Sequence, residues 1–177
     1  MKKNYLIDYV AYMRHLAEEH AKLRHTPREP HFFRGELEEF VNGLRSGVSF
    51  PCLVTESNEV EYEGSKSNLI KKRTTSFIIV DSYENVGDFN ETDEKMSLCE
   101  MIAEDILSRM MSDTDKPFRL AQIEGADGNY MLNETDRYVG YRVTLTMVEP
   151  NVCIVNNNAW VKEEEDEPVT DTGNEQG

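Results

Sequence analysis

Four histidines near the N-terminus are the first residues in this sequence whose type suits metal binding or proton transfer: His15, His20, His25 and His31. A zinc site on a helix needs two histidines on one face. His15 and His20 are five residues apart, which places them about 140° apart around a helix. The stretch HLAEEH also misses the inverted zinc-protease spacing by one residue. The pattern favours a polar helix surface, and we expect no metal or other cofactor.

The carboxylate-rich segment 88–100, DFNETDEKMSLCE, has oxygen-bearing side chains at alternate positions, as a calcium-binding loop does. Such a loop also needs glycine at its sixth position and a bidentate glutamate at its twelfth. Asp93 and Cys99 stand there instead. The start of a helix is the better interpretation, with Asn90 as its candidate N-cap.

No combination of residues predicts a catalytic mechanism. The stretch GADGN (125–129) lacks the lysine and the strand–loop–helix context of a phosphate-binding loop, so it predicts a turn. The sequence has neither a GxSxG-type nucleophile motif nor a credible Cys–His pair. We expect no catalytic residues and a non-enzymatic protein, with a hydrolase of unrecognised site as a third alternative.

The charge of the chain restricts its partners. The 177 residues carry a formal net charge of −15, and residues 162–177 account for −6 of it through seven carboxylates and one lysine. Nucleic-acid binding needs clustered basic residues, and the one dense basic run is Lys71-Lys72-Arg73. We therefore expect no specific binding to nucleic acid.

The N-terminal residues contain no apolar run long enough for a signal peptide or a membrane span, because Asp8 and Arg14 interrupt it. The three cysteines, Cys52, Cys99 and Cys153, each lie in an apolar pattern. Buried thiols in a reducing compartment explain this odd number better than a disulfide framework does. We expect a soluble protein, cytoplasmic when synthesised, with no membrane association.

Hydrophobic periodicity predicts an α+β fold, with a mixed, mainly antiparallel sheet packed against a long amphipathic helix, extra N-terminal helices and an acidic C-terminal tail. Helices are predicted over 4–24, 32–46 and 93–112. Strands are predicted over 51–56, 74–83, 118–125 and 137–148, with a weak edge strand near 60–62, a turn at 126–129 and a last strand over 151–161. The cleanest alternation is YVGYRVTLTMV at 138–148.

These elements suggest an N-terminal helix and linker (1–30), an α+β core domain (31–161) and an acidic tail (162–177). The long helix needs a sheet to cover its apolar stripe, and the predicted shared core is Phe77, Ile79, Ile102, Ile106, Val143 and Leu145. The tail has two interpretations. It is either a solvating, disordered segment or a peptide that orders against a basic partner surface.

Residues 32–161 resemble bacteriophage head–tail joining proteins, particularly the tail-terminator and neck-ring proteins of tailed phages. The resemblance lies in the order of elements, in which a helix leads into FPCLVTE (50–56), a spacer precedes SFIIVDSY (76–83), and an acidic loop precedes the helix MSLCEMIAEDILSRMM (96–111). The strand FRLAQIE (118–124), a turn and the closing strand DRYVGYRVTLTMVEP (136–150) follow. The closing strand in this family often follows a short polar segment and carries a glycine. Asp136 and Gly140 stand in those places.

This resemblance implies a non-enzymatic virion protein, made in the cytoplasm of the bacterial host, that forms a homo-oligomeric ring at the head–tail junction or tail end. Its partners would be neighbouring phage head, neck or tail proteins. Acidic walls would let DNA pass through the ring without sticking. The alternative function is an acidic protein-binding or inhibitor module, such as a DNA mimic.

Two segments are candidates for contacts between subunits or with neighbouring rings. The helix over 4–24 has more tyrosines and aliphatic residues than one domain face covers. Segment 57–73 is too long and polar for an ordinary connection, and its basic run could meet the acidic run of the tail. The candidate interface residues are Tyr5, Tyr9, Tyr12, Lys71, Lys72, Arg73, Glu163, Glu164 and Glu165.

Overall fold

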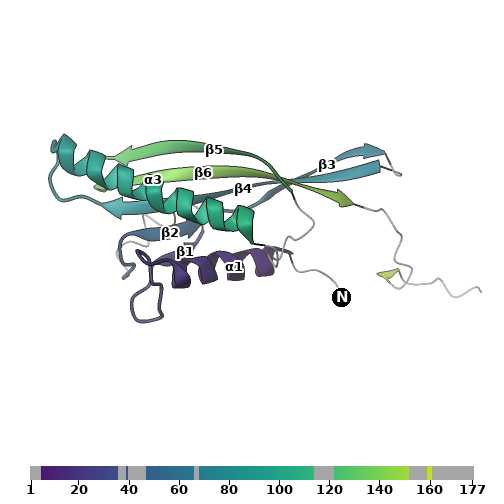
Figure 1. Cartoon of the computed structure of the whole chain (residues 1–177), viewed down its shortest axis with the longest axis horizontal. Coiled ribbons are helices and arrows are strands. Elements are labelled where there is room, and N and C mark those ends of the chain that lie inside the picture. The colour runs from purple at the N-terminus through teal and green to yellow at the C-terminus, as the bar shows by residue number, and fades with distance from the viewer. Residues whose placement is uncertain are drawn as a thin grey trace, which may run out of the picture.

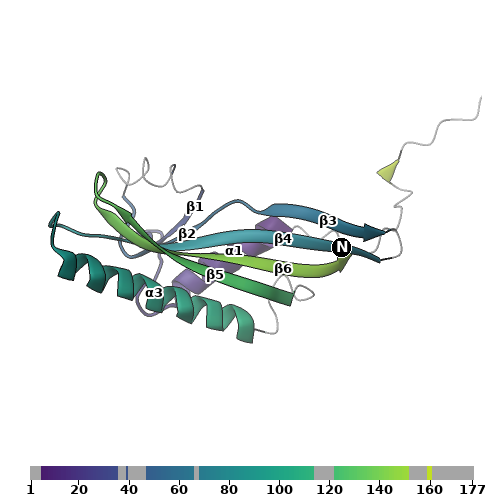
Figure 2. The ribbon, with the colours of Figure 1, turned by 90° about the horizontal axis from the view of Figure 1, so that it is seen from above.

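The computed structural model is a mixed sheet of six strands with helices packed on one face (Figures 1 and 2). It describes residues 5–35, 39, 47–65, 68–113, 122–151 and 159–160. The described elements are, in chain order, α1 (Tyr5–Glu19), β1 (Phe32–Arg34), β2 (Cys52–Thr55), β3 (Glu59–Ser65), β4 (Asn68–Ser82), α3 (Phe89–Ser112), β5 (Gln122–Asn133) and β6 (Tyr138–Asn151). The predicted α+β class, with a mostly antiparallel sheet on a long helix, is confirmed.

The two longest strands, β4 and β6, form the centre of the sheet. The strand order is β1-β2-β4-β6-β5, and β3 also pairs with β4. The β4–β6 pairing is antiparallel and runs from Leu69 opposite Asn151 to Ser82 opposite Tyr138. Along the other edge of β4, β3 pairs with its first half and β2 with its second half. Only β1 and β2 are parallel among these described pairs.

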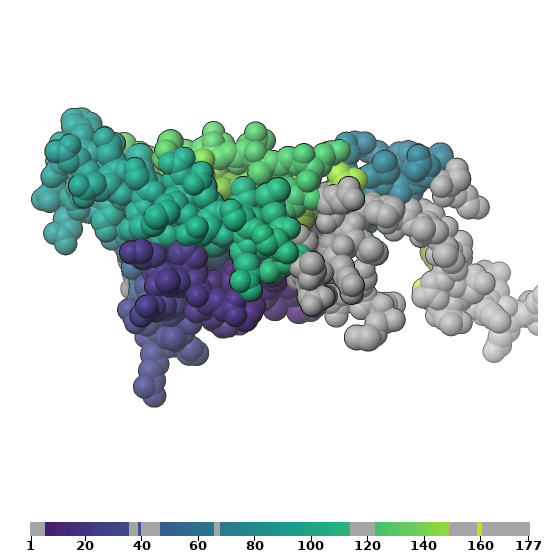
Figure 3. Space-filling model, in the orientation of Figure 1, coloured from purple at the N-terminus to yellow at the C-terminus, as the bar shows by residue number. Residues whose placement is uncertain are grey.

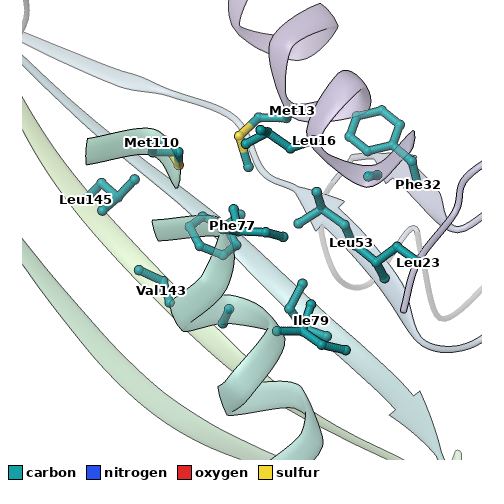
Figure 4. Close-up of a cluster of buried hydrophobic side chains, with 14 of the residues drawn as sticks. Met13, Leu16, Leu23, Phe32, Leu53, Phe77, Ile79, Met110, Val143 and Leu145 are labelled. Atoms are coloured by element: carbon teal, nitrogen blue, oxygen red, sulfur yellow. The ribbon is translucent and has the colours of Figure 1, made fainter. Parts of the chain in front are cut away.

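The main hydrophobic core lies between the sheet and both helices, on what we call the helix face (Figure 4). It contains all six residues predicted from the sequence, so that prediction is confirmed. Helix α1 adds Tyr9, Met13, Leu16 and Ala17 to the same cluster. The opposite, outer face carries a smaller cluster formed by Cys52, Val54, Ile78, Val80 and Tyr138.

Gly140 explains how β6 and β4 approach closely at the covered end of the sheet. A Cβ atom at this position would lie 2.8 Å from the carbonyl oxygen of Ile79 on β4. Real Cβ atoms do not come so near a backbone oxygen, so a larger residue would push the central strands apart. The glycine in the closing strand therefore has a packing role here.

The helix predicted over 32–46 is wrong at its start, because Phe32–Arg34 forms strand β1. Phe32 and Phe33 fit a helical stripe and a strand equally well, and the parallel pairing of β1 with β2 decides between them. Of the remaining range, only Gly35 and Glu39 are among the described residues. The described residues therefore contain one N-terminal helix, and α1 ends at Glu19 rather than near residue 24.

The turn predicted at 126–129 is also wrong, because β5 continues through it to Asn133. Pairing with β6 overrides the local turn preference of ADGN, with a bulge between Ile123 and Gly125. A Cβ at Gly128 would clash with the side chain of Tyr141 on β6. This glycine therefore leaves space for the tyrosine ring and does not form a turn.

Three further expectations shift at their boundaries. The weak edge strand near 60–62 is the full strand β3, and the strand predicted at 74–83 already begins at Asn68. Helix α3 begins at Phe89, and Asp88 rather than Asn90 caps it by accepting hydrogen bonds from the backbone N–H groups of Asn90 and Glu91. The predicted last strand over 151–161 lies outside the described residues, except for Asn151, Ala159 and Trp160, and so does the acidic tail.

Ile106→Ala should lower the free energy of unfolding by roughly 2–5 kcal/mol, because Ile106 is buried between α3 and the sheet and its loss leaves a cavity. Urea unfolding monitored by circular dichroism measures the change. Met111→Ala on the same helix is the control, because Met111 is 63% exposed. Equal losses for the two variants would contradict the packing of α3.

Gly140→Ala should lower the free energy of unfolding by roughly 1–3 kcal/mol, because the added methyl group overpacks the contact between β6 and β4. Gly125→Ala is the matched control, since a Cβ there would have no atom within 4 Å. The same unfolding experiment compares the two. A Gly140→Ala protein as stable as the control would show that close approach at Ile79 is not what selects glycine.

Candidate functional site

The most exposed regular structure among the described residues is a β-arm, which we define as β3 with the adjoining residues 68–74 of β4 and 148–151 of β6. Figures 1 and 2 show it extending beyond α1 and α3, and Figure 3 shows β3 at that end of the surface. All seven residues of β3 are exposed. A positive φ of 104° at Gly64 helps the chain turn between β3 and β4.

The two faces of the β-arm differ in character, because neighbouring strand residues point to opposite faces. Glu59, Glu61 and Glu63 lie on the outer face, and Val60 and Tyr62 lie on the helix face. Lys72 Nζ is 3.1 Å from a carboxylate oxygen of Glu63. That hydrogen bond raises the pKa of Lys72 above its ordinary value.

The basic run predicted as an interface lies in the β-arm but does not form one basic patch. Lys71 and Arg73 point to the helix face, and Lys72 points to the outer face beside Glu63. The ammonium of Lys71 lies 5.7 Å from the centre of the Tyr62 ring, within the range of a cation–π interaction. Arg73 is buried at the base of the arm. Alternation along β4 therefore separates three residues that are adjacent in sequence.

Two tyrosines of α1, Tyr9 and Tyr12, connect the helix to the rest of the chain. Tyr9 is fully buried, and its hydroxyl accepts a hydrogen bond from Thr75 of β4. Burial raises the pKa of Tyr9 to about 12. The hydroxyl of Tyr12 donates to a carboxylate oxygen of Asp113 at 2.8 Å, and burial together with this bond raises the pKa of Tyr12.

The predicted interface residues of α1 and the tail are thus placed unevenly. The buried side chain of Tyr9 is covered by this chain's own core and is not available to a partner. The side chain of Tyr5 and the residues Glu163, Glu164 and Glu165 lie outside the described residues. The large apolar residues that α1 does expose are Leu6 and Ile7. They line a shallow hollow of about 300 Å³ together with Val10, Ala11, Arg14 and Arg34.

A polar junction at the base of the β-arm was not predicted from the sequence. A carboxylate oxygen of Glu56, in the connection from β2 to β3, lies 2.6 Å from a guanidinium nitrogen of Arg142 on β6. Nearby, the hydroxyls of Ser76 and Thr144 are 3.0 Å apart. Within the described part of the chain, Arg142 Nε and the buried hydroxyl of Thr55 make no hydrogen bond. The ion pair ties the start of the arm to the central strands, because it joins β6 to the β2–β3 connection.

The histidines are spread over different neighbourhoods. His15 lies beside Glu18 and Glu19 on the surface of α1, and His20 Nε2 is 3.4 Å from a carboxylate oxygen of Asp105 on α3. His31 is buried, with its Nδ1 2.7 Å from the carbonyl oxygen of Pro51. Across the described ranges, no three His, Cys, Asp or Glu side chains gather closely enough to hold a metal ion.

Cys52 and Cys99 are free thiols buried in the two hydrophobic clusters. Burial raises the pKa of both, that of Cys99 to about 12. Neither thiol is therefore a ready nucleophile near neutral pH. Of the helices that the structure describes, none combines the length and the apolar character needed to cross a membrane.

No protein-family model and no curated protein matches this sequence. Two features stand out on the described surface. One is the exposed β-arm, with one acidic face and one partly apolar face, and the other is the hollow at the N-terminal end of α1.

His25→Asn should reduce the loss of stability between about pH 7.5 and 5.5. Burial lowers the pKa of His25 below its ordinary 6.5, and its Nδ1 must stay unprotonated to accept the backbone N–H of His31 at 3.0 Å. The unfolded chain therefore binds this proton at a higher pH than the folded chain does. The stability that neutral His25 contributes is therefore complete above about pH 6.5, and it is lost as the pH falls below that value.

Urea midpoints measured across this pH range test the assignment. The amide oxygen of asparagine keeps an acceptor at position 25 but does not titrate, and His15→Asn, at an exposed position, serves as the control. A His25→Asn protein that loses as much stability on acidification as the parent chain would contradict the role of His25.

Proposed function

We propose that this chain is a non-enzymatic structural protein of a tailed bacteriophage, which assembles into a homo-oligomeric ring at the head–tail junction or tail end. The observation that carries the proposal is the β-arm. A fully exposed seven-residue strand covers no core of its own chain. A second molecule packed against this strand would bury it, as an assembly interface does.

The sheet also has the asymmetry that ring assembly needs. A ring forms when one surface of a subunit contacts a different surface of the next and the rotation closes. The outermost strands are β1 and β3 on one side and β5 on the other. Open strand edges are avoided in monomers because they invite pairing with other chains. Within the described part of the chain, β3 and β5 each have such an open edge, and this supports an assembling protein.

The charge is compatible with a DNA passage. A net charge of −15 repels the phosphate backbone and opposes sticking. The ring would then act through shape complementarity. It would provide a channel for DNA and docking surfaces for neighbouring head, neck or tail proteins. The resemblance in element order supports the phage assignment through β2, β4, α3, β5 and β6. Two of its elements differ, because the leading helix starts as strand β1 and the turn is part of β5.

Native mass spectrometry of the full chain, with salt varied, tests the proposal. We expect one closed oligomer of defined subunit number at tens of micromolar protein. The oligomer should persist as salt increases, because salt screens the repulsion between acidic subunits. A strictly monomeric chain under all these conditions would contradict the ring and would favour the acidic binding or inhibitor protein.

Deleting residues 162–177 separates the two interpretations of the acidic tail. If the tail only solvates the protein, the deletion leaves assembly unchanged. If the tail docks on a basic surface of a neighbour, the deletion weakens assembly. The same mass spectra report both outcomes.

A further inference from the structure

Among the described residues, two long strands, β3 and β5, have one edge without a paired strand, on opposite sides of the sheet. Within the described residues, β3 pairs only with β4, and β5 pairs only with β6. Figure 2 shows these two strands along opposite borders of the sheet. Since each neighbouring strand pair from β3 through β4 and β6 to β5 is antiparallel, β3 and β5 run in opposite directions. In two subunits of like orientation, β3 of one and β5 of the next would form an antiparallel pair.

Both edges expose apolar side chains on the same face. On β3, Val60 is 37% and Tyr62 is 58% exposed. On β5, Tyr130 is 55% and Leu132 is 50% exposed. All four belong to the helix face, because their partners on β4 and β6 are odd-numbered residues of that face. A joined edge would thus bring the four together on one side of a continuous sheet.

We infer that β3 of one copy of this chain pairs with residues 127–133 of β5 in the next copy, so that the sheet continues from subunit to subunit. The inference rests on the proposed ring and names its subunit interface. In the matching register, Val60 lies opposite Leu132 and Tyr62 lies opposite Tyr130. All seven residues of β3 then find a partner, from Glu59 opposite Asn133 to Ser65 opposite Asp127.

This register also avoids repulsion on the outer face. Glu59, Glu61 and Glu63 face Asn133, Met131 and Asn129, none of which is charged. A shift of two residues toward the start of β5 sets Glu63 opposite Asp127. The opposite shift carries Val60 past the end of β5, to Glu134. Like charges directly opposite one another destabilise a strand pair, so the first shift is worse. The second shift is worse because Glu59 and Val60 then have no strand partner on β5.

The β5 side is already held in position for such a contact. The ring of Tyr130 packs edge-on against Tyr141 with centroids 5.0 Å apart, and its hydroxyl donates to Glu100 of α3 at 2.5 Å. Pairing with Tyr62 would therefore cost little ordering on this side. The join is staggered along the strands, because β3 lies at one end of the sheet and residues 127–133 at the other. Closed β-barrels accommodate such a stagger by tilting their strands.

Cysteine crosslinking of the full chain tests the register. In a Cys153→Ser background, Val60→Cys with Leu132→Cys should form disulfides between subunits under mild oxidation and give a ladder up to the ring number. Val60→Cys with Met131→Cys is the matched control, because its thiols lie on opposite faces. It should crosslink at least tenfold less. Dimers from Val60→Cys alone would show that two β3 edges pair with each other and would overturn the inference.

Charge substitution provides a second test that needs no disulfide geometry. Val60 and Leu132 are exposed, so charged residues there spare the folded core. Val60→Asp with Leu132→Asp should weaken association at least tenfold by sedimentation. Val60→Asp with Leu132→Lys should restore most of it, because opposite charges then meet. Equal association of the two double variants would overturn the pairing.

The outcomes separate this inference from the proposed function. A closed ring that shows neither the crosslink nor the charge rescue means that the edge pairing is wrong and the ring stands. Crosslinking into open chains of unlimited length means that the pairing stands and the ring is wrong. A monomer without crosslinks at tens of micromolar contradicts both.

Discussion

The long antiparallel pairing of β4 with β6 is the interaction on which the rest of this structure depends. It runs without interruption from Leu69 and Asn151 to Ser82 and Tyr138. Its covered half carries Phe77, Ile79, Val143 and Leu145, which both helices bury. Its other half continues past the helices as the β-arm, to which β3 adds a third strand. One continuous ladder therefore joins a conventional core to an element with no core of its own.

Two local features hold other parts of the chain close to this ladder. Gly140 lets β6 approach the backbone of β4 at the covered end. At the base of the arm, Glu56 and Arg142 connect the start of β3 to β6 at 2.6 Å. Rigid attachment matters for the proposed assembly, because an arm that moved freely would lose more conformational entropy on pairing with a neighbour.

Sequence patterns predicted the helices and strands whose buried and exposed side chains alternate with a regular period. The stripe of α3 and the alternation of β6 both contact the core, so periodicity identified Ile106 and Val143 as partners. The first half of β4 was missed because Lys71, Lys72 and Arg73 belong to an arm that is wet on most of its surface. Pairing with β3 and β6, which no local pattern encodes, makes it a strand.

Long-range contacts also explain the two errors of element type. Phe32 and Phe33 suit a helix locally, yet β2 holds them in a strand. ADGN favours a turn locally, yet β6 holds it in β5. For the candidate site, the sequence shows one basic run but not that β4 divides Lys71, Lys72 and Arg73 between two faces. It also marked Tyr9 as a contact residue, although that side chain is buried in the core. The edge residues Tyr130 and Leu132 had no sequence signal, because they follow the turn predicted at 126–129, in a segment where no strand was predicted.

Cryo-electron microscopy of the assembled full chain examines the central claim most directly, since it displays the subunit boundary itself. The account predicts a closed ring in which β3 of each subunit lies beside β5 of the next, as one sheet across the boundary. Rings in which both strand edges face solvent, or particles no larger than a single chain, would contradict it.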